Sequence, residues 1–199
     1  MADSPTTVVL GADGLARCPW PTEDPLYLAY HDDEWAVPVR GERALFERLT
    51  LEAFQSGLSW ITVLRKRDAF RAAFADFNPQ TVARFSLDDR ARLMKDASII
   101  RNRAKIDATI RNASAVLRVR EGVNGGLDGL IWSFAPIPAP PAPVSLADVP
   151  SSTPESTALA KELKRRGFSF VGPTTAYAMM QACGLVNDHL LGCHARRDG

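Results

Sequence analysis

The fold of this chain is decided by a stretch near its carboxyl end, Lys164-Arg165-Arg166-Gly167-Phe168-Ser169-Phe170-Val171-Gly172-Pro173-Thr174-Thr175. An apolar helix resumes directly after it, at Ala176-Tyr177-Ala178-Met179-Met180-Gln181. Gly167 can adopt a positive φ and so end a preceding helix. The hydrophobic side chains that can anchor the turn are Phe168, Phe170 and Val171. The stretch therefore predicts a helix, a hairpin and a second helix.

The amides at the start of the second helix are a candidate site for an anion. The first amide hydrogens of a helix have no acceptor within it, so they can bind a nucleic-acid phosphate without regard to base sequence. The residues expected at the DNA backbone are Lys164, Arg165, Gly167, Gly172 and Thr174. From the pattern alone, an ordinary helix corner in an all-α core is an equal alternative.

Helical periodicity extends through the rest of the chain, and strand-like alternation is scarce. One buried stripe is predicted for Ile99, Ile106, Ile110, Ala113 and Leu117. A further helix should begin at Ser152-Thr153-Pro154-Glu155, where a hydroxyl cap, a proline and a reciprocal glutamate combine, and end near Arg166. The predicted fold class is therefore all-α.

One expected helix carries the first candidate for catalysis. It should run from Glu42 to Gln55 and end near Gly57. Its inward residues are Leu45, Phe46, Leu49 and Ala53. Glu52 lies at the edge of this stripe, where a carboxylate needs hydrogen-bond partners or a reason to lose its hydration. Against this, a glutamate in such a place often extends its carboxylate into water.

Composition favours one globular protein. The chain has 199 residues, 46% of them hydrophobic, which is enough for a substantial core. We expect residues 1–16 to form a mobile tail and residues 17–199 to form one domain of two helical lobes. Five prolines within residues 135–143 predict a surface loop, over about residues 135–150, between two helical blocks.

Cysteine usage and the lack of a leader favour the cytoplasm. Three cysteines give no even-numbered disulfide framework and suit a reducing compartment. The amino end lacks a basic and apolar leader, and no apolar run is long enough for a membrane span. We therefore expect a cytoplasmic monomer with no membrane contact and no obligate protein partner.

The net charge of +1 identifies no partner, but basic residues are clustered. The clusters are Arg65-Lys66-Arg67, Arg101 with Arg103 and Lys105, and Lys164-Arg165-Arg166. Each could hold phosphates, although a single such cluster is more often a solvated helix end.

Four residues at opposite ends of the chain can form one zinc site: Cys18, His31, His189 and Cys193. Zinc accepts two thiolates and two imidazoles in closed structural sites. We expect residues 187–193 to be helical, which would place His189 and Cys193 on one face. Four protein ligands leave no position for water, so the expected Zn²⁺, one per chain, is structural. The alternatives are ordinary thiols and histidines, or His194 in place of His189.

Aromatic residues gather around the first zinc half-site and the Glu52 helix. They are Trp20, Tyr27, Tyr30, Trp35 and Trp60. Flat rings beside a carboxylate can stack on an extruded base while the carboxylate accepts its hydrogens. A plain hydrophobic core is the alternative, because aromatic residues at such positions are usually buried.

Several blocks of sequence occur together in a fixed order. They are Arg17-Cys18-Pro19-Trp20, Asp24-Pro25-Leu26-Tyr27, Tyr30-His31-Asp32-Asp33-Glu34-Trp35, Gln55-Ser56-Gly57-Leu58-Ser59-Trp60-Ile61-Thr62-Val63-Leu64, Ile99-Ile100-Arg101-Asn102-Arg103, and Gly167-Phe168-Ser169-Phe170-Val171-Gly172 through Cys193. This order resembles the bacterial 3-methyladenine DNA glycosylase I family over nearly everything after residue 16. The resemblance implies an all-helical helix-hairpin-helix DNA glycosylase fold with a structural zinc joining the two terminal segments.

The resemblance also implies an activity in base excision repair. It implies a hydrolase that flips out 3-methyladenine from double-stranded alkylated DNA and excises it, leaving an abasic site. The family pattern makes Glu52 and Tyr30 hydrogen-bond partners of the base and places Trp60 in a stack on it. It assigns the pocket walls to Trp20, Tyr27 and Trp35, and the zinc to Cys18, His31, His189 and Cys193.

One departure and one absence bear on these expectations. Ala36 stands where the family commonly has glycine. Other members of the superfamily use an aspartate and a lysine near the hairpin in catalysis. The resembled family lacks both residues, and residues 173–180 of this chain also contain neither. A cationic methylated base leaves readily, so we expect selection by Glu52 and monofunctional hydrolysis without a lysine nucleophile. The alternatives are a zinc-stapled DNA-binding module without catalysis and a zinc hydrolase.

Overall fold

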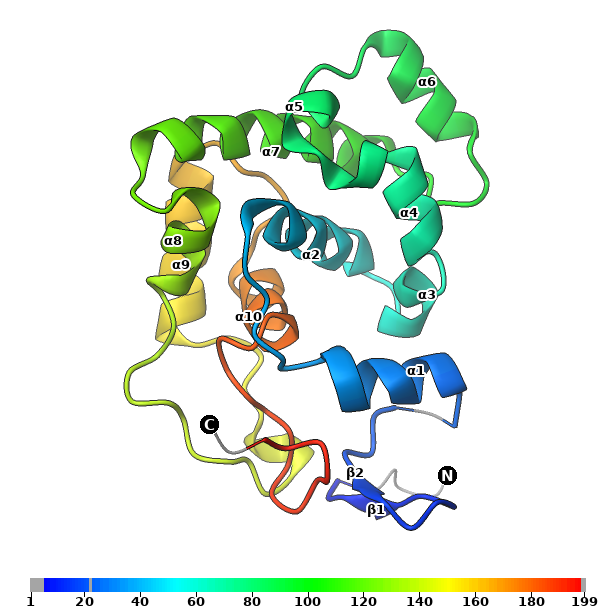
Figure 1. The fold of residues 1–199 in the computed structure, drawn as a ribbon, viewed down its shortest axis with the longest axis vertical. Helices are drawn as coiled ribbons and strands as arrows, with labels where there is room; N and C mark the ends of the chain where they lie inside the picture. The colour runs from blue at the N-terminus through cyan, green and yellow to red at the C-terminus, as the bar shows by residue number, and fades with distance from the viewer. Residues whose placement is uncertain (1–5, 22, 198–199) are drawn as a thin grey trace.

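The computed structural model describes residues 6–21 and 23–197. Helices dominate this part of the chain, and its two strands, β1 (Val9–Leu10) and β2 (Ala16–Arg17), pair antiparallel (Figure 1). The predicted all-α class is therefore confirmed for the described residues. None of the helices among them is both long and apolar enough to cross a bilayer.

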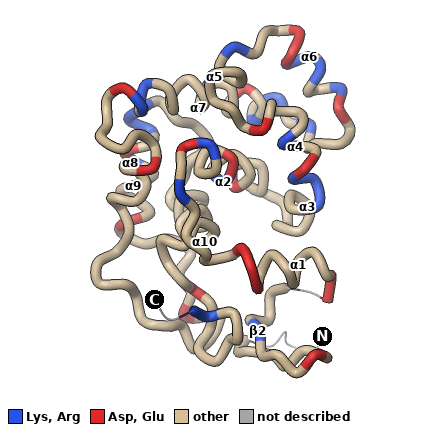
Figure 2. Tube along the Cα trace, viewed as in Figure 1, with Lys and Arg blue, Asp and Glu red and all other residues tan. Residues whose placement is uncertain are grey.

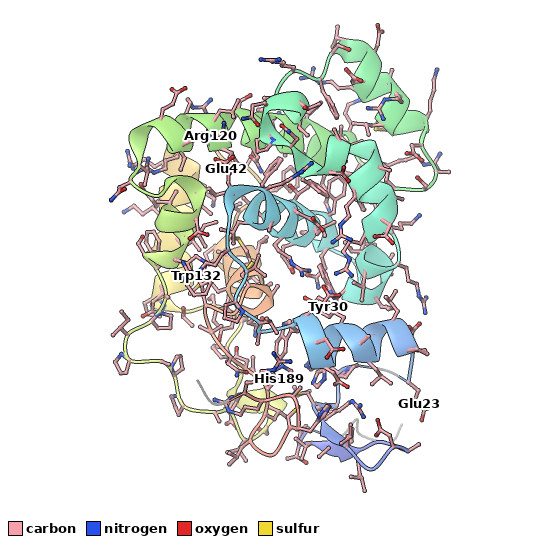
Figure 3. All side chains as sticks on the ribbon, viewed as in Figure 1. Glu23, Tyr30, Glu42, Arg120, Trp132 and His189 are labelled. Atoms are coloured by element: carbon pink, nitrogen blue, oxygen red, sulfur yellow. The ribbon has the colours of Figure 1, made fainter. Side chains whose placement is uncertain are left out.

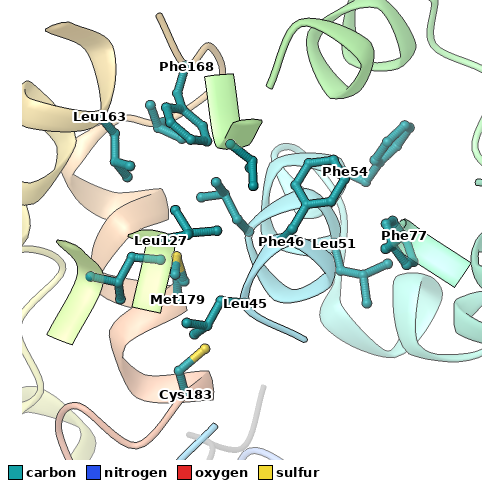
Figure 4. Packing of buried hydrophobic residues seen from close by; sticks show 14 of the residues in the cluster. Leu45, Phe46, Leu51, Phe54, Phe77, Leu127, Leu163, Phe168, Met179 and Cys183 are labelled. Carbon is teal, nitrogen blue, oxygen red and sulfur yellow. The ribbon is translucent and has the colours of Figure 1, made fainter. Parts of the chain in front are cut away.

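Helix α2 (Glu42–Gln55) lies at the centre of the molecule, with the predicted bounds (Figure 1). A helix that is apolar on most sides must be enclosed by other elements. Figure 4 shows Phe46 and Leu45 of α2 near Leu127 of α8 (Gly126–Trp132) and Met179 of α10 (Pro173–Ala182). The helix ends where predicted, because Gly57 adopts a φ of 84°.

The helices on one side of α2 are α3 (Trp60–Leu64), α4 (Arg67–Ala73), η2 (Ala75–Phe77), α5 (Pro79–Val82), α6 (Leu87–Lys95) and α7 (Arg103–Gly122). The predicted stripe on α7 is confirmed for Ile106, Ile110 and Ala113, which are buried. Ile99 is buried ahead of the helix, and Leu117 is only half-buried. The helical period of 3.6 carries the buried face to Val116 instead.

The predicted helix-hairpin-helix is present. Helix α9 (Pro154–Arg165) is capped by Thr153, whose reciprocal partner is Ser156 and not the expected Glu155. Gly167 has a φ of 91° and ends the helix. The hairpin is anchored by buried Phe168 and Val171.

Phe170 does not anchor the hairpin, so that prediction was wrong. Its backbone is in the left-handed region, with a φ of 57°, and its side chain is 39% exposed. Instead, Asn112 of α7 holds the turn from the other side. The Ser169 amide donates to Asn112 Oδ1 at 2.8 Å, and Asn112 Nδ2 donates to the Ser169 carbonyl at 3.1 Å.

Described segments near the two ends of the chain lie side by side, below α1 (Pro25–Ala29) in Figure 1. The His194 amide donates to the Ala16 carbonyl at 2.8 Å. Of the expected tail, residues 1–5 fall outside the described part. Residues 6–16 contain β1 and make backbone contacts beyond the tail, as where the Leu146 amide donates to the Thr6 carbonyl at 2.8 Å.

The expected proline-rich loop connects α8 to α9 and contains the short η3 (Leu146–Asp148). Residues 133–147 carry no charge, whereas acidic and basic positions are interspersed along α4 to α7 (Figure 2). Part of the loop contacts the carboxyl-terminal segment, because the Leu191 amide donates to the Pro143 carbonyl at 2.7 Å. The loop thus leads from the helical blocks to the region where the described amino-terminal and carboxyl-terminal segments meet.

Candidate active site and candidate metal centre

A cavity of about 220 Å³ opens where α1, α2, α3 and α10 approach the terminal segments. Its wall includes all six residues that the sequence suggested for a base pocket: Trp20, Tyr27, Tyr30, Trp35, Glu52 and Trp60. Neighbouring rings are in contact: the ring centroids of Trp20 and Trp35 lie 5.0 Å apart, and those of Tyr30 and Trp60 lie 5.3 Å apart. The arrangement is a mostly aromatic cavity with a carboxyl group in its wall.

Glu52 is buried, and no group of residues 6–21 and 23–197 donates a hydrogen bond to its carboxyl. Only 5% of its surface is exposed, so its carboxylate does not extend into bulk water. Burial raises its pKa to about 8, against the opposing effect of the positive Arg48. At neutral pH the free carboxyl therefore holds its proton, and a cation bound in the cavity would favour the ionised form.

Tyr30 reaches the same cavity from a short π-helix, η1 (Tyr30–Glu34). The Trp35 amide donates to the Tyr30 carbonyl at 2.8 Å, which is the five-residue bond of a π-turn. Burial, and secondarily the charge of Glu52, keep the Tyr30 pKa well above its usual value. Its phenol therefore stays neutral and can donate a hydrogen bond.

The indole of Trp60 has an unused hydrogen-bond donor. Its side chain is 8% exposed, and Nε1 is buried without an acceptor in the described part of the chain. Trp60 begins α3, and its ring contacts that of Tyr30, with the two ring planes tilted by 45°. A planar group entering the cavity would therefore meet the aromatic surface of Trp60.

Arg48 is a residue of this region that the sequence argument missed. It lies one turn before Glu52 on α2, and its Nη2 donates to Glu34 Oε2 at 3.0 Å. Arg67 binds the same carboxylate from α4, through Nη2 and Oε1 at 2.9 Å. The i, i+4 spacing of Arg48 and Glu52 on α2 was the available signal for Arg48, because residues four apart share a helix face.

Asp188 also lines the cavity and was missed. It is 5% exposed, and its Oδ2 accepts hydrogen bonds from Tyr177 Oη at 2.6 Å and Gln181 Nε2 at 2.8 Å. Its position next to His189 was the only signal in the sequence. The cavity therefore contains a second carboxylate, which is fixed by two side chains of α10.

The four expected zinc ligands converge at one buried point. Cys193 Sγ lies 3.5 Å from His189 Nδ1 and 3.6 Å from His31 Nε2. Cys18 Sγ lies 3.8 Å from His189 Nδ1. A tetrahedral ion with Zn–S bonds of about 2.3 Å and Zn–N bonds of about 2.0 Å separates sulfur and nitrogen by about 3.5 Å. The side chains therefore fit a zinc ion.

The charges of the two thiols also fit a cation. The pKa of the Cys193 thiol is lowered, first by its hydrogen bond with Cys18 and then by those with His189 and His31. The same Cys193 contact and burial raise the pKa of Cys18. In the free protein one sulfur of the pair therefore ionises and the other keeps its proton, because like charges that share a site oppose each other's ionisation; a bound cation would allow both to be thiolates.

The imidazoles are oriented by polar groups behind them. His31 Nδ1 contacts Asp32 Oδ1 at 2.7 Å, and His189 Nε2 contacts the Trp35 carbonyl at 3.3 Å. Metal-binding histidines usually donate their other ring nitrogen in this way. Tyr30 and His31 are adjacent in sequence, yet Tyr30 lines the cavity and His31 belongs to the Cys/His cluster. Figure 3 shows Tyr30 and His189 in neighbouring segments of the chain.

His194, the alternative nitrogen ligand, is engaged elsewhere. Its Nε2 lies 3.0 Å from Asp32 Oδ1. The expected helix over residues 187–193 is absent, so that prediction was wrong. Gly184 and Gly192, with φ of 73° and 88°, end α10 and turn the following loop. His189 and Cys193 therefore meet through a turn and not along a helical face.

The basic clusters divide between structural and exposed residues. Lys105 is buried, and its Nζ donates to the Phe54 and Ser56 carbonyls at the end of α2, at 2.9 and 2.7 Å. It is therefore not available to a phosphate. Arg165 is exposed but forms an ion pair with Glu162, with 2.7 Å between Arg165 Nε and Glu162 Oε2. Of the residues expected at a DNA backbone, Lys164, Gly167 and Thr174 are exposed and Gly172 is half-buried.

Comparison with known proteins agrees with this geometry. The family model described as methyladenine glycosylase matches residues 20–197. DNA-3-methyladenine glycosylase 1 of Escherichia coli (strain K12) is 50% identical over 90% of this chain and 96% of its own length. A crystal structure of 3-methyladenine DNA glycosylase I superposes with a TM-score of 0.85 at 50% identity, covering 89% of this chain and 98% of that one.

A variant of 3-methyladenine DNA glycosylase I in complex with 3-methyladenine superposes with a TM-score of 0.83 at 35% identity. The match covers 89% of this chain and 95% of that chain. The family match spans the cavity, the hairpin and three of the four cluster residues, His31, His189 and Cys193. The chain belongs to the methyladenine glycosylase family.

Proposed function

We propose that this chain is a DNA glycosylase that hydrolytically excises 3-methyladenine from double-stranded alkylated DNA. The observation that carries the proposal is Glu52, a buried carboxyl in an aromatic cavity that accepts no hydrogen bond from the described part of the chain. Such a group is costly in the free protein, and a cationic base would relieve that cost. The relatives named above as DNA-3-methyladenine glycosylases support the same activity.

In this proposal each cavity residue has a distinct part. Trp60 stacks on the flipped base, and its neighbours Trp20, Tyr27 and Trp35 form the walls. Glu52 accepts hydrogens from the base, and Tyr30 provides a further hydrogen bond. Unmodified adenine carries no charge, so it gains less from an ionised Glu52 than 3-methyladenine does. The carboxylate therefore selects the lesion.

The chemistry demands little acid catalysis. Methylation at N3 makes the base cationic, so it departs as a neutral molecule when the bond to C1′ breaks. Water then captures the sugar and leaves an abasic site. We assign no lysine nucleophile, because the described residues that line the cavity include no lysine. A covalent adduct trapped by borohydride reduction would contradict this monofunctional hydrolysis.

We also propose that Cys18, His31, His189 and Cys193 hold one structural Zn²⁺. Its chemistry there would be that of a closed tetrahedral clasp, because all four positions belong to the protein. The clasp would keep the segment with Trp20 and Tyr30 against the carboxyl-terminal loop. A zinc hydrolase would instead need an open position for water, so metal analysis showing only three protein ligands would favour that alternative.

DNA-backbone contacts are proposed for the exposed side of the hairpin. The residues are Lys164, Arg165, Gly167, Gly172 and Thr174. Arg165 would exchange its exposed ion pair with Glu162 for a phosphate, which costs little at the surface. We expect residues 17–199 to act as one monomeric glycosylase domain with two helical lobes. Because its relatives are bacterial DNA glycosylases, we expect it to work on the nucleoid in the cytoplasm.

Base release from methylated DNA tests the proposal. The purified chain should release 3-methyladenine, identified by chromatography, and Glu52→Gln should lose this release while it keeps its DNA affinity. Glu121→Gln, on the exposed end of α7, is the matched control and should behave as the unmodified chain. A DNA-binding module without catalysis would release no base from any of the three proteins.

A further inference from the structure

The cavity contains two carboxyl groups, and the proposed function employs only one. Among the described residues, Glu52 and Asp188 are the only acidic side chains in its wall. They come from different elements, because Glu52 belongs to α2 and Asp188 to the loop after α10. If Glu52 binds the base, Asp188 remains for another part of the same reaction.

The sugar needs a group that the base contacts do not supply. When the bond between C1′ and the base breaks, its electron pair leaves with the base, and a positive charge develops on the deoxyribose. A water oxygen then forms the new bond to C1′, and the released proton passes to solvent. A fixed negative group lowers the barrier if it faces the developing charge and orients that water.

Asp188 is held in a way that suits this task. Both of its hydrogen bonds end on Oδ2, from Tyr177 Oη at 2.6 Å and Gln181 Nε2 at 2.8 Å. Oδ1 accepts none from the residues that the structure describes, although it belongs to a side chain of the cavity wall. Groups fixed before the reaction act without the cost of reorganising during it. One oxygen is therefore anchored and the other is available to the cavity.

We propose that Asp188 is a catalytic residue, whose Oδ1 accepts a hydrogen bond from the attacking water and faces the charge at C1′. Tyr177 and Gln181 are its positioning residues. This inference rests on the proposed glycosylase function and assigns the group that directs the water. Asp188 does not take up the water's proton, so the role depends on its charge and position alone.

Single-turnover release of 3-methyladenine from a methylated duplex tests the role. Asp188→Asn keeps the shape of the side chain but removes its charge. We expect its rate to fall on the order of 100-fold, the low end for losing one fixed electrostatic contact. Its affinity for free 3-methyladenine and its zinc content should stay unchanged, because neither involves the sugar. Asp88→Asn, at an exposed position of α6, is the matched control.

Each outcome decides a separate point. An unchanged rate in Asp188→Asn overturns the inference, as does a loss of base affinity that parallels the rate, since Asp188 would then only shape the pocket. If Asp188→Asn does not fold, Tyr177→Phe removes one anchor of the carboxylate, and it should lower kcat without changing KM. An unchanged kcat there would also overturn the inference. If the unmodified chain releases no base, the proposed function itself fails.

Discussion

Replacing Glu52 by glutamine should stabilise the free protein at neutral and alkaline pH. The pKa of Glu52 is raised from 4.5 to about 8 by burial. Below pH 4.5 the carboxyl is protonated in both the folded and the unfolded chain, so its ionisation costs nothing. Above that pH the unfolded chain ionises first, and the folded chain loses relative stability until the pH passes the folded pKa.

The magnitude follows from the two pKa values. The ionisation of Glu52 should lower the free energy of unfolding by about 3 kcal/mol at pH 7 and by about 5 kcal/mol at pH 9, relative to pH 4. Glutamine cannot ionise, so Glu52→Gln should escape this loss. The difference in unfolding free energy between the two proteins should therefore grow with pH and level off above pH 8.

Urea unfolding of the two proteins at pH 5, 7 and 9 measures this difference. Other titrating groups cancel in the comparison, and Glu121→Gln controls for the loss of a surface charge. The same Glu52→Gln protein should be inactive in base release, so one substitution raises stability and removes activity. A difference in stability that does not depend on pH would refute the account of Glu52 as a buried and unpaired carboxyl.

Three further substitutions test other parts of the structure. Cys193→Ser should lose bound zinc, measured by elemental analysis, and lower Tm by roughly 10 °C; an unmodified chain purified without zinc would contradict the clasp. Ala36→Gly should raise the unfolding free energy by about 1 kcal/mol, because Ala36 has a φ of 62°, and a lower Tm would argue against backbone strain there. Lys105→Met should lower the free energy of unfolding, measured in urea, by about 1–3 kcal/mol, because it leaves two carbonyls without a donor. It should not weaken DNA binding, and weaker binding would show that Lys105 contacts a phosphate after all.

Local patterns determined the parts of the fold that could be predicted. The bounds of α2 followed from a periodic apolar stripe and Gly57, and the end of α9 followed from Gly167. Phe170 could not be placed in the same way, because whether a hairpin side chain is buried depends on the turn's left-handed residues. Local pattern therefore fixes where a helix begins and ends better than it fixes the direction of a loop side chain.

The candidate site depended more on contacts between distant residues. The sequence brought Cys193 and His189 together through an expected helix, whereas a turn joins them in the structure. Lys105 looked like a surface cation because its acceptors lie 49 and 51 residues away. Asp188 has no pattern of its own, since its role depends on Tyr177 and Gln181 reaching it from α10. Such partners are set by tertiary packing.

Selective base release is the most direct test of the central claim that a buried carboxyl in an aromatic cavity selects a cationic base. The purified chain should be incubated with a methylated DNA duplex, and the released bases should be separated and quantified by chromatography. The account predicts release of 3-methyladenine without release of unmodified adenine. Absence of 3-methyladenine among the products, or release of both bases at equal rates, would contradict it.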